Sequence, residues 1–424
     1  MRLLVVCPHL EPDTAPTGEV ISRVILELAR SGHEIDVVTA LPWYRGHRVA
    51  AGWGGRPLRR SHRGETLPAA VAGGPGAGSV TVTRVHPFPT RRRSLAARGA
   101  GFAGFTLLAA AASVLRRTRP DAVLAMSPPL TLGLAGWAAA RRFGVPLVFN
   151  VQDVFPDAAI EVGAISNRRI ITASRRLERL VYGACDAVTV LSEEMRANVA
   201  AKVDPARGPE LRIIPNFSDT AEIRPQNRHT AYRTEHGLGE RTVVMYAGNI
   251  GYSQPLETLV AAARACRDRR DMVFVVNGEG SAREALEESA TGLPNLVLVD
   301  FQPAARISEV LASADVHVIL LREGLAHSSV PSKLYSIMAA GRPVLAAVDP
   351  GTEVARVLER TGCGEAVAPA DETAFIAALQ AMIDDPRRRA QMGARGRAFA
   401  EAWFSASDAA GAYGALLEEL TADR

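Results

Sequence analysis

The chain has 424 residues, and at roughly 100–200 residues per domain this length predicts two or three domains. Hydrophobic residues make up 47% of the chain and charged residues 22%, a composition typical of globular proteins that excludes a disordered or fibrous chain. We find no apolar run of the roughly 20 residues that span a bilayer, and the four cysteines stand far apart. We therefore expect no transmembrane helix, no metal-binding cysteine cluster and no disulfide framework.

Basic residues are concentrated in one stretch, although the net charge is only +4. Arginines are frequent between Arg45 and Arg98, where Glu65 is the only acid, and an apolar segment follows at 99–115. This Arg45–Leu115 region predicts peripheral contact with an anionic membrane or a lipid-linked phosphate. A solvated loop and a packed helix are the alternatives. Nucleic-acid binding is disfavoured, because the stretch lacks interleaved aromatic residues for base stacking.

The first half of the chain predicts a parallel α/β domain. An apolar run at 2–7, a helical repeat at 19–29 and an apolar run at 34–39 form one βαβ unit. Gly18 lies just before that helix, where a helix N-terminus can face an anion. Residues 45–79 show no periodicity and predict a long, mobile insertion. Further strands are expected at 80–85, 121–126, 146–151, 186–191 and 211–214.

Two acids follow the strand predicted at 146–151, in the segment Gln152-Asp153-Val154-Phe155-Pro156-Asp157. Ionisable groups at the carboxyl end of a parallel strand are candidates for site chemistry. We expect Asp153 to take part in that chemistry. Asp157 is expected only to cap a turn after the proline.

A polar stretch at 220–240, interrupted by proline and glycine, predicts a linker between domains at 1–219 and 241–400. The helical tail at 401–424 is expected to pack back on the first domain. Two doubly wound α/β domains of similar size predict a cleft between them. The strands of the second domain are expected at 242–247, 272–277, 295–301, 315–321, 343–348 and 365–368.

The loops after these strands are rich in small residues, and one of them carries Lys333 at the start of a helix. A lysine is unfavourable there because the helix N-terminus is already positive, so its place is better explained by a bound anion. Glycines for close approach, a lysine for phosphate and an acid for ribose hydroxyls suit a nucleoside diphosphate. The expected donor-binding residues are Gly248, Asn249, Ile250, Gly251, Asn277, Gly278, Glu279, Phe301, Gln302, Pro331, Ser332, Lys333, Leu334, Tyr335, Thr352 and Glu353.

Five segments together carry a resemblance to a known family. They are Gln152–Asp157, Ile214–Asp219, Tyr246–Gly251, Val330–Pro343 and Gly351–Glu353. In order and spacing, over nearly the whole chain, they resemble the retaining, nucleotide-sugar-dependent glycosyltransferases of family 4. That family has the GT-B fold, in which two Rossmann-like domains face a central cleft. Within it, the chain is most similar to the bacterial cell-surface polysaccharide branch that includes the L-fucosamine transferases.

The resemblance implies roles for the two domains. The C-terminal domain would bind a nucleotide-diphosphate sugar, with UDP the usual carrier, and the N-terminal domain a saccharide or polyprenyl-diphosphate-linked acceptor. Lys333 would contact the diphosphate, and Glu353 the sugar or ribose. Gly18 would let its loop approach the donor phosphates, and Asp153 would orient the acceptor or accept its proton. The resemblance implies no metal or cofactor. The scattered cysteines fit a cytoplasmic protein, and the basic region fits a peripheral place at the inner face of the membrane.

The chain also departs from the family pattern. Ser328 and Ser336 stand where many relatives carry a pair of glutamates, Asn249 and Gln254 where many carry arginine and lysine, and Gln152 where histidine is common. Three alternatives therefore stay open: a non-hydrolysing nucleotide-sugar 2-epimerase, a catalytically idle nucleotide-sugar-binding partner, and a transferase acting on a soluble natural product. Conversion of the donor without any acceptor would distinguish the epimerase.

Overall fold

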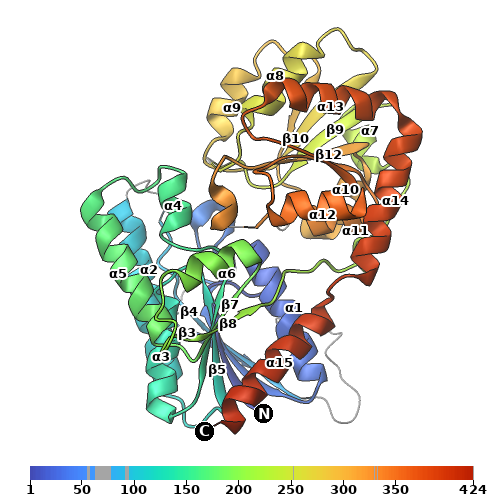
Figure 1. The fold of residues 1–424 in the computed structure, drawn as a ribbon. Helices are drawn as coiled ribbons and strands as arrows, with labels where there is room; N and C mark the ends of the chain where they lie inside the picture. The colour runs from blue at the N-terminus through green and yellow to red at the C-terminus, as the bar shows by residue number, and fades with distance from the viewer. Residues whose placement is uncertain are drawn as a thin grey trace. The chain divides into compact units, whose positions relative to one another are not determined.

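The computed structural model describes residues 1–54, 58–62, 78–90, 95–251, 253–328, 330–331 and 333–423. The chain forms two compact α/β units (Figure 1). Unit 1 comprises Met1–Ile160, Ile165–Asn216 and Ser405–Arg424, and unit 2 comprises Glu161–Ala164 and Phe217–Phe404. The predicted class, two doubly wound α/β domains, is confirmed.

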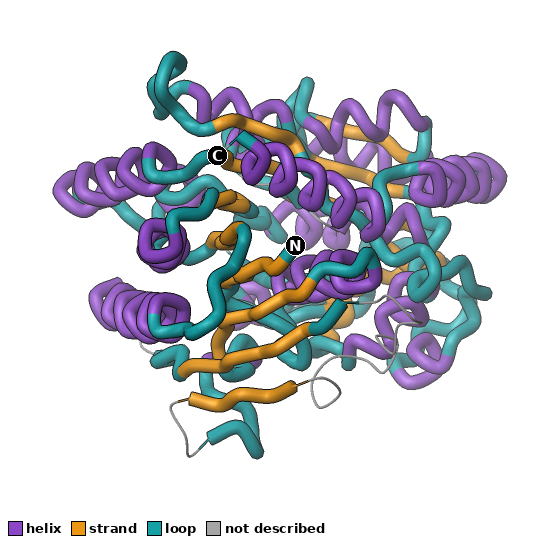
Figure 2. Tube along the Cα trace, turned by 90° about the horizontal axis from the view of Figure 1, so that it is seen from below, coloured by secondary structure: helices purple, strands orange, loops and turns teal. Residues whose placement is uncertain are grey.

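The sheet of unit 1 has the strand order β3-β4-β2-β1-β5-β6-β7-β8, and every neighbouring pair is parallel except β3 with β4. Its central strands are apolar and buried because helices cover both faces of a parallel sheet (Figure 2). The chain order reverses between β1 and β5, so ligands are expected beyond the carboxyl ends of these strands. The strands are β1 (Arg2–Val6), β2 (Glu34–Ala40), β3 (Leu58–His62), β4 (Val80–Val85), β5 (Ala122–Ser127), β6 (Leu147–Val151), β7 (Ala187–Val190) and β8 (Glu210–Ile213).

The last helix of the chain belongs to unit 1, where it packs against the first one. Tyr413 on this last helix is buried, and its hydroxyl lies 2.6 Å from Asn150 Nδ2 at the end of β6. The C-terminal segment is therefore part of the unit-1 core. The helices of unit 1 are α1 (Pro16–Arg30), α2 (Leu95–Val114), α3 (Leu132–Phe143), α4 (Asp157–Glu161), α5 (Arg168–Gly183), α6 (Glu193–Ala200) and α15 (Ala406–Ala422), with a 3₁₀ turn, η1, at Arg45–His47.

The expected irregular insertion at 45–79 contains a strand. β3 pairs in antiparallel register with β4, so the prediction of no regular structure was wrong there. Arginine and histidine side chains obscured this edge strand, because an edge strand needs no apolar alternation on either face. Residues 55–57 and 63–77 lie outside the described part of the chain.

Helix α2 corrects the expectation that no apolar run is long enough to span a bilayer. Its segment Ala97–Val114 has a mean hydropathy of 1.3 and meets that length and composition, with 28% of the segment buried. The core helix of a soluble protein meets the same criterion. Here α2 packs against α3 and over β2 and β4.

The sheet of unit 2 is parallel, with the order β11-β10-β9-β12-β13-β14. Its chain order reverses between β9 and β12, which marks the expected ligand edge. The strands are β9 (Thr242–Ala247), β10 (Met272–Asn277), β11 (Leu296–Val299), β12 (Val316–Leu320), β13 (Val344–Ala347) and β14 (Gly364–Val367). The helices are α7 (Ala231–Glu235), α8 (Glu257–Ala265), α9 (Arg283–Ser289), α10 (Ile307–Ala312), α11 (Lys333–Ala339), α12 (Glu353–Thr361), α13 (Glu372–Asp384) and α14 (Pro386–Ala402), with 3₁₀ turns η3 (Ala304–Arg306) and η4 (Leu325–His327).

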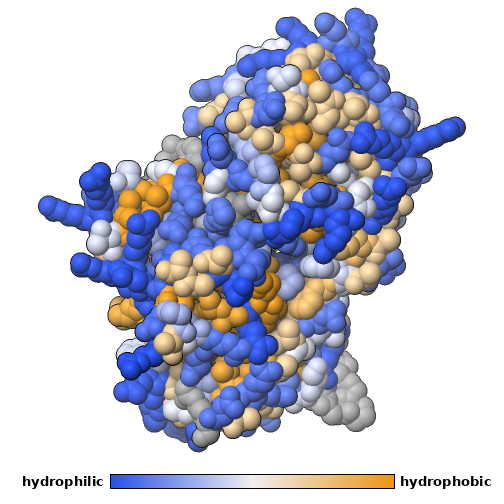
Figure 3. All heavy atoms as spheres, in the orientation of Figure 1, coloured by the Kyte–Doolittle hydropathy of each residue, from blue (hydrophilic) through white to orange (hydrophobic). Residues whose placement is uncertain are grey.

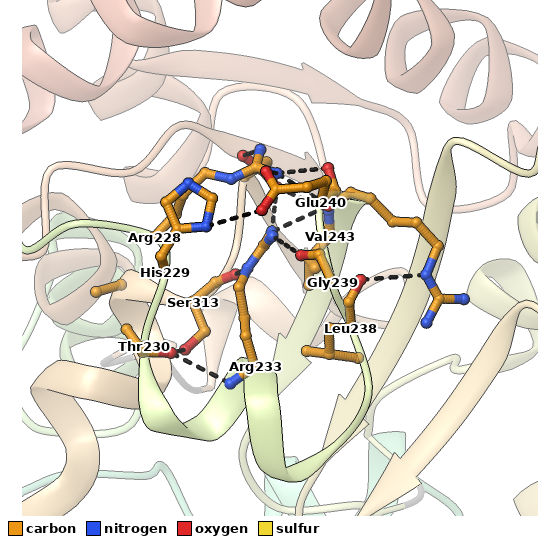
Figure 4. Close-up of polar contacts among 12 residues, drawn as sticks. Arg228, His229, Thr230, Arg233, Leu238, Gly239, Glu240, Val243 and Ser313 are labelled. Atoms are coloured by element: carbon orange, nitrogen blue, oxygen red, sulfur yellow. Dashed lines mark hydrogen bonds and ion pairs between the residues drawn. The ribbon is translucent and has the colours of Figure 1, made fainter.

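Residues 220–240, expected to form a linker, instead pack into unit 2. The buried Arg233 lies 2.6 Å from Asp315, just before β12, and Arg228 lies 2.7 Å from the same carboxylate. Arg233 also donates to the carbonyl oxygen of Gly239 at 2.7 Å (Figure 4). The network lies at the amino end of β9 and β12, opposite the expected ligand edge. Proline and glycine made this segment look like a linker, but here they form turns in an ordered clamp.

Candidate active site

Lys333 begins α11 at the carboxyl edge of the unit-2 sheet. Its ammonium donates a hydrogen bond to the hydroxyl of Tyr246 and lies 3.8 Å from the centroid of that ring. Burial lowers the pKa of Lys333 to about 7. Among the residues that the structure describes, no carboxylate forms an ion pair with this lysine. A bound phosphate would supply the missing charge and raise the pKa of Lys333 again.

Gly248 lies directly under the lysine side chain. A Cβ atom at Gly248 would lie 2.3 Å from Cε and 2.5 Å from Nζ of Lys333, and the φ angle of Gly248 is +142°. Both the backbone conformation and the space therefore require glycine. The loop after β9 and the start of α11 thus meet at the point where the strand order reverses, as the sequence predicted for a ligand edge.

The loops after β9 and β10 are interlocked through their backbones. Ile250 N donates to Glu279 O at 2.8 Å, and Gly248 N donates to Asn277 O at 2.9 Å. A Cβ atom at Gly278 would lie only 1.9 Å from Gly248 O. These contacts hold the loops after β9 and β10 together, and they keep Gly248 against Lys333.

Several predicted donor-binding residues shape the site instead of exposing their side chains. Ile250, Leu334 and Tyr335 are buried in the core. Asn277 is also buried, and its Oδ1 accepts a hydrogen bond from Tyr232 at 3.0 Å. Other contacts are local: Asn249 O accepts from Tyr246, Gly251 N donates to Gln254, and Pro331 O accepts from Leu334 N. Ser332 lies outside the described residues.

Glu353 occupies the first turn of α12, which Thr352 caps by accepting a hydrogen bond from Ala355 N. Its carboxylate lies 2.8 Å from Arg356 and is partly exposed. Burial raises the pKa of Tyr335 on α11, and the Glu353 carboxylate raises it further. The start of α12 therefore faces the α11 region that begins with Lys333.

Phe301 and Gln302 follow β11, the edge strand of the sheet. Phe301 is exposed, whereas Gln302 accepts a hydrogen bond from Arg306 at 3.2 Å. Arg306 in turn pairs with Glu235 and Glu309. Gln302 is thus part of a local ionic network, and its contact with a donor remains a prediction.

Unit 1 places two of the predicted residues at its own ligand edge. Gly18 lies within the first turn of α1 and not in a loop before the helix, which corrects its predicted place. It packs against His9, and a Cβ atom at Gly18 would lie 2.9 Å from His9 Cβ. Asp153 is half-buried after β6, and burial, Asp13 and Asp153 together raise the pKa of Tyr44. Asp153 therefore lies near the loops that follow β1 and β2.

Asp157 does not cap a simple turn as expected. It begins α4 and pairs with Lys202 at 2.6 Å, and Lys202 also pairs with the buried Glu178. These ion pairs give Asp157 a structural role and do not place it at the reacting centre.

Four residues of interest were not predicted from the sequence as site residues. His9 and Asp13 follow β1, and the rule that selected Asp153 at a strand end would also have selected His9. Tyr246 was hidden within an apolar strand. Glu161 accepts a hydrogen bond from the buried Ser328. No sequence pattern indicates that last contact, because it joins residues far apart in the chain.

Each of the two units matches a known protein family. Residues 17–216 match the glycosyl transferase 4-like domain, and residues 241–385 match the glycosyl transferases group 1 family. The chain is 30% identical over 278 residues to the probable glycosyltransferase WbjE of Pseudomonas aeruginosa, across 64% of this chain and 67% of WbjE. This chain belongs to the glycosyltransferase family of GT-B fold.

A further relative and two solved structures are similar to nearly the whole length of this glycosyltransferase, the structures in fold alone. It is 24% identical to the putative colanic acid biosynthesis glycosyl transferase WcaI of Escherichia coli K12, across 91% of this chain and 93% of WcaI. Sucrose-phosphate synthase of Thermosynechococcus elongatus has a similar fold, with a TM-score of 0.74, 17% identity and full coverage of both chains. Anabaena HepE, solved with UDP-glucose, gives a TM-score of 0.66 at 13% identity, across 99% of this chain and 100% of HepE.

Proposed function

We propose that this glycosyltransferase moves a sugar from a nucleotide-diphosphate sugar, with UDP as the nucleotide, to a hydroxyl of a saccharide or lipid-linked acceptor in cell-surface glycan synthesis. The observation that carries the donor assignment is the ammonium of Lys333, held against Gly248 with no carboxylate paired to it among the described residues. The UDP-glucose complex of HepE and the colanic acid role in the name of WcaI support the donor and the pathway class.

The proposed reaction begins with the donor diphosphate at Lys333 and the backbone amides of the glycine loops. The bond between the anomeric carbon and the diphosphate oxygen breaks with oxocarbenium character. Lys333 stabilises the charge that develops on the leaving diphosphate, so the proposal requires no metal. Glu353 contacts the sugar or ribose. The acceptor hydroxyl, oriented by Asp153, attacks from the face that the diphosphate leaves, and the anomeric configuration is retained.

We also propose peripheral contact with the inner face of the membrane, through a smaller part of the Arg45–Leu115 region than the sequence suggested. Arg84 is buried and donates to the carbonyl oxygens of Leu10 and Ala40, so it is not part of a basic surface. Arg56, Arg63 and 91–93 lie outside the described residues. Helix α2 supports the contact because it contains no acid and exposes Leu107, with Leu115 exposed just after it.

Charge on a neighbouring helix supports the same contact. Helix α5, which lies next to α3, carries Arg168, Arg169, Arg175, Arg176 and Arg179, and its single acid, Glu178, is buried and paired with Lys202. On the face of the molecule drawn in Figure 3, exposed apolar side chains lie among hydrophilic ones. Co-sedimentation with anionic but not neutral vesicles tests the contact, and L107E should weaken it.

The transferase proposal is tested by incubating the protein with UDP- and GDP-sugars and a panel of saccharide and polyprenyl-diphosphate acceptors. We expect acceptor-dependent release of nucleoside diphosphate and a glycoside of retained configuration by NMR. Conversion of the donor without acceptor would indicate an epimerase instead. Binding without any transfer would indicate an idle partner. Family membership favours transfer over both.

A further inference from the structure

A buried histidine–aspartate pair lies at the ligand edge of unit 1. His9 follows β1, and its Nδ1 lies 2.7 Å from Asp13 Oδ2. The two side chains are 10% and 4% exposed. The loop that carries them begins where the strand order reverses between β1 and β5, which is the edge where ligands bind in open α/β sheets.

The hydrogen bonds of Asp13 determine which nitrogen of His9 carries the proton. The second oxygen of Asp13 accepts hydrogen bonds from Thr14 N at 3.0 Å and Tyr44 N at 3.1 Å. An ionised carboxylate only accepts, so Nδ1 must donate to it, and the neutral ring then has its lone pair on Nε2. None of the described residues hydrogen-bonds His9 Nε2, and this atom is not among the fully buried atoms without a partner. It is therefore open to a ligand.

The surrounding residues hold the imidazole in place. Trp43 stacks on the His9 ring at 5.3 Å between centroids, and Tyr44 meets it edge-on at 5.5 Å. Gly18 packs behind its Cβ atom. The buried Arg84 donates to carbonyl oxygens of the loop after β1 and of the end of β2, which joins the two segments. Such fixed orientation is what a proton-accepting side chain requires.

The pair also lies close to the residue expected to face the acceptor. After burial, the carboxylates of Asp13 and Asp153 are the groups that raise the pKa of Tyr44. Tyr44 therefore has the histidine–aspartate pair on one side and Asp153 within electrostatic range. Strands β1, β5 and β6 are neighbours in the sheet, so their carboxyl ends share one edge.

We propose that His9 accepts the proton of the acceptor hydroxyl, that Asp13 positions and stabilises it, and that Asp153 only orients the acceptor. The acceptor oxygen bonds to the anomeric carbon as the bond from that carbon to the diphosphate oxygen breaks. The electron pair of that bond leaves with the diphosphate, and the hydroxyl proton moves to His9 Nε2. The Asp13 carboxylate then stabilises the imidazolium. This inference rests on the proposed transferase function.

The test compares kcat, and KM for the acceptor, of H9Q, D13N and D153N with those of wild type at saturating donor. Removing a general base costs about 100-fold or more, so we expect H9Q to lower kcat by that factor while nucleotide affinity stays unchanged. D13N should give an intermediate kcat. D153N should mainly raise KM for the acceptor.

His33 offers a matched control, because it is as buried as His9 but precedes β2 at the amino end of the sheet. H33Q should keep kcat, and thermal unfolding of each variant reports any loss of structure. The proposal is overturned if H9Q keeps kcat within about threefold, if its loss follows only its unfolded fraction, or if D153N lowers kcat as much as H9Q does. A wild-type protein that transfers no sugar would contradict the transferase function itself, and with it this role.

Discussion

The ammonium of Lys333 lies over the aromatic ring of Tyr246, 3.8 Å from its centroid. A cation held by a ring face in place of a carboxylate is only weakly compensated for its loss of water. This is why burial lowers the pKa of Lys333 to about 7, and why a second, anionic partner would be bound favourably. Positioned at the reversal point of the sheet, the lysine is the centre of the proposed donor site.

Replacing Lys333 by methionine tests this role while keeping the volume of the side chain. We expect K333M to lower kcat/KM for the donor by about 100- to 1,000-fold, the usual effect of removing one group that stabilises developing charge. Its free energy of unfolding should stay the same or rise, because a poorly solvated charge has been removed. Steady-state kinetics and urea unfolding measure both quantities. Equal activity of K333M and wild type would exclude Lys333 from the site.

The lowered pKa of Lys333 predicts a pH dependence of donor binding. A nucleotide sugar keeps its diphosphate charge across this range, so only the lysine titrates. Below about pH 7 the ammonium is already formed, and affinity should be constant. Above it, binding must take up a proton, and affinity should fall by up to about tenfold per pH unit. Calorimetry in buffers of different ionisation enthalpy should show that uptake, and K333M should show none.

Lys333 also makes the free energy of unfolding depend on pH. Donor affinity should fall as the pH rises, whereas the contribution of Lys333 to stability should increase. In the unfolded chain the lysine has its ordinary, higher pKa, so between about pH 7 and that value the unfolded state binds more protons than the folded state. Stability relative to K333M should therefore rise with pH across this window. Denaturant unfolding of both proteins at two pH values measures the difference, and a constant or falling difference would contradict the assigned pKa.

Gly248 should tolerate no side chain. In G248A, the new methyl group would overlap the Lys333 stem, and the φ angle of +142° would be strained. We expect at least a tenfold loss of nucleotide affinity and about 1–3 kcal/mol of destabilisation. G183A is a matched control, because a Cβ atom at Gly183 meets nothing within 4 Å. Unchanged nucleotide affinity in G248A would show that the lysine does not depend on this contact.

The buried clamp of Arg233 and Asp315 should matter for stability and not for chemistry. R233M leaves a buried carboxylate without one of its partners, which typically costs about 3–5 kcal/mol. R269M removes two exposed ion pairs, with Asp271 and Asp384, and should cost less than about 1 kcal/mol for each. Because the clamp lies at the amino end of the sheet, kcat per folded molecule should not change. A selective loss of kcat in R233M would contradict this separation.

Much of the fold could be predicted because parallel strands buried on both faces are apolar runs that alternate with helices. The segment 220–240 was missed because its glycines and proline are equally common in linkers and in tight turns, and only the long-range partner of Arg233 distinguishes the two. β3 was missed because an edge strand is not required to be apolar.

The candidate site could be predicted only in part, because strand ends indicate which loops share an edge but not which side chains meet. That rule led to Lys333, Gly248 and Asp153. It could not reveal Tyr246, which points out of an apolar strand toward the lysine. Nor could it show that buried residues such as Leu334 and Asn277 support the loops from within.

The most direct test of the central claim is calorimetric titration of wild type and K333M with a panel of UDP- and GDP-sugars. The account predicts that wild type binds a UDP-sugar most tightly and that K333M binds it at least about tenfold more weakly while remaining folded. Binding of no nucleotide sugar by wild type, or equal binding by K333M, would contradict it.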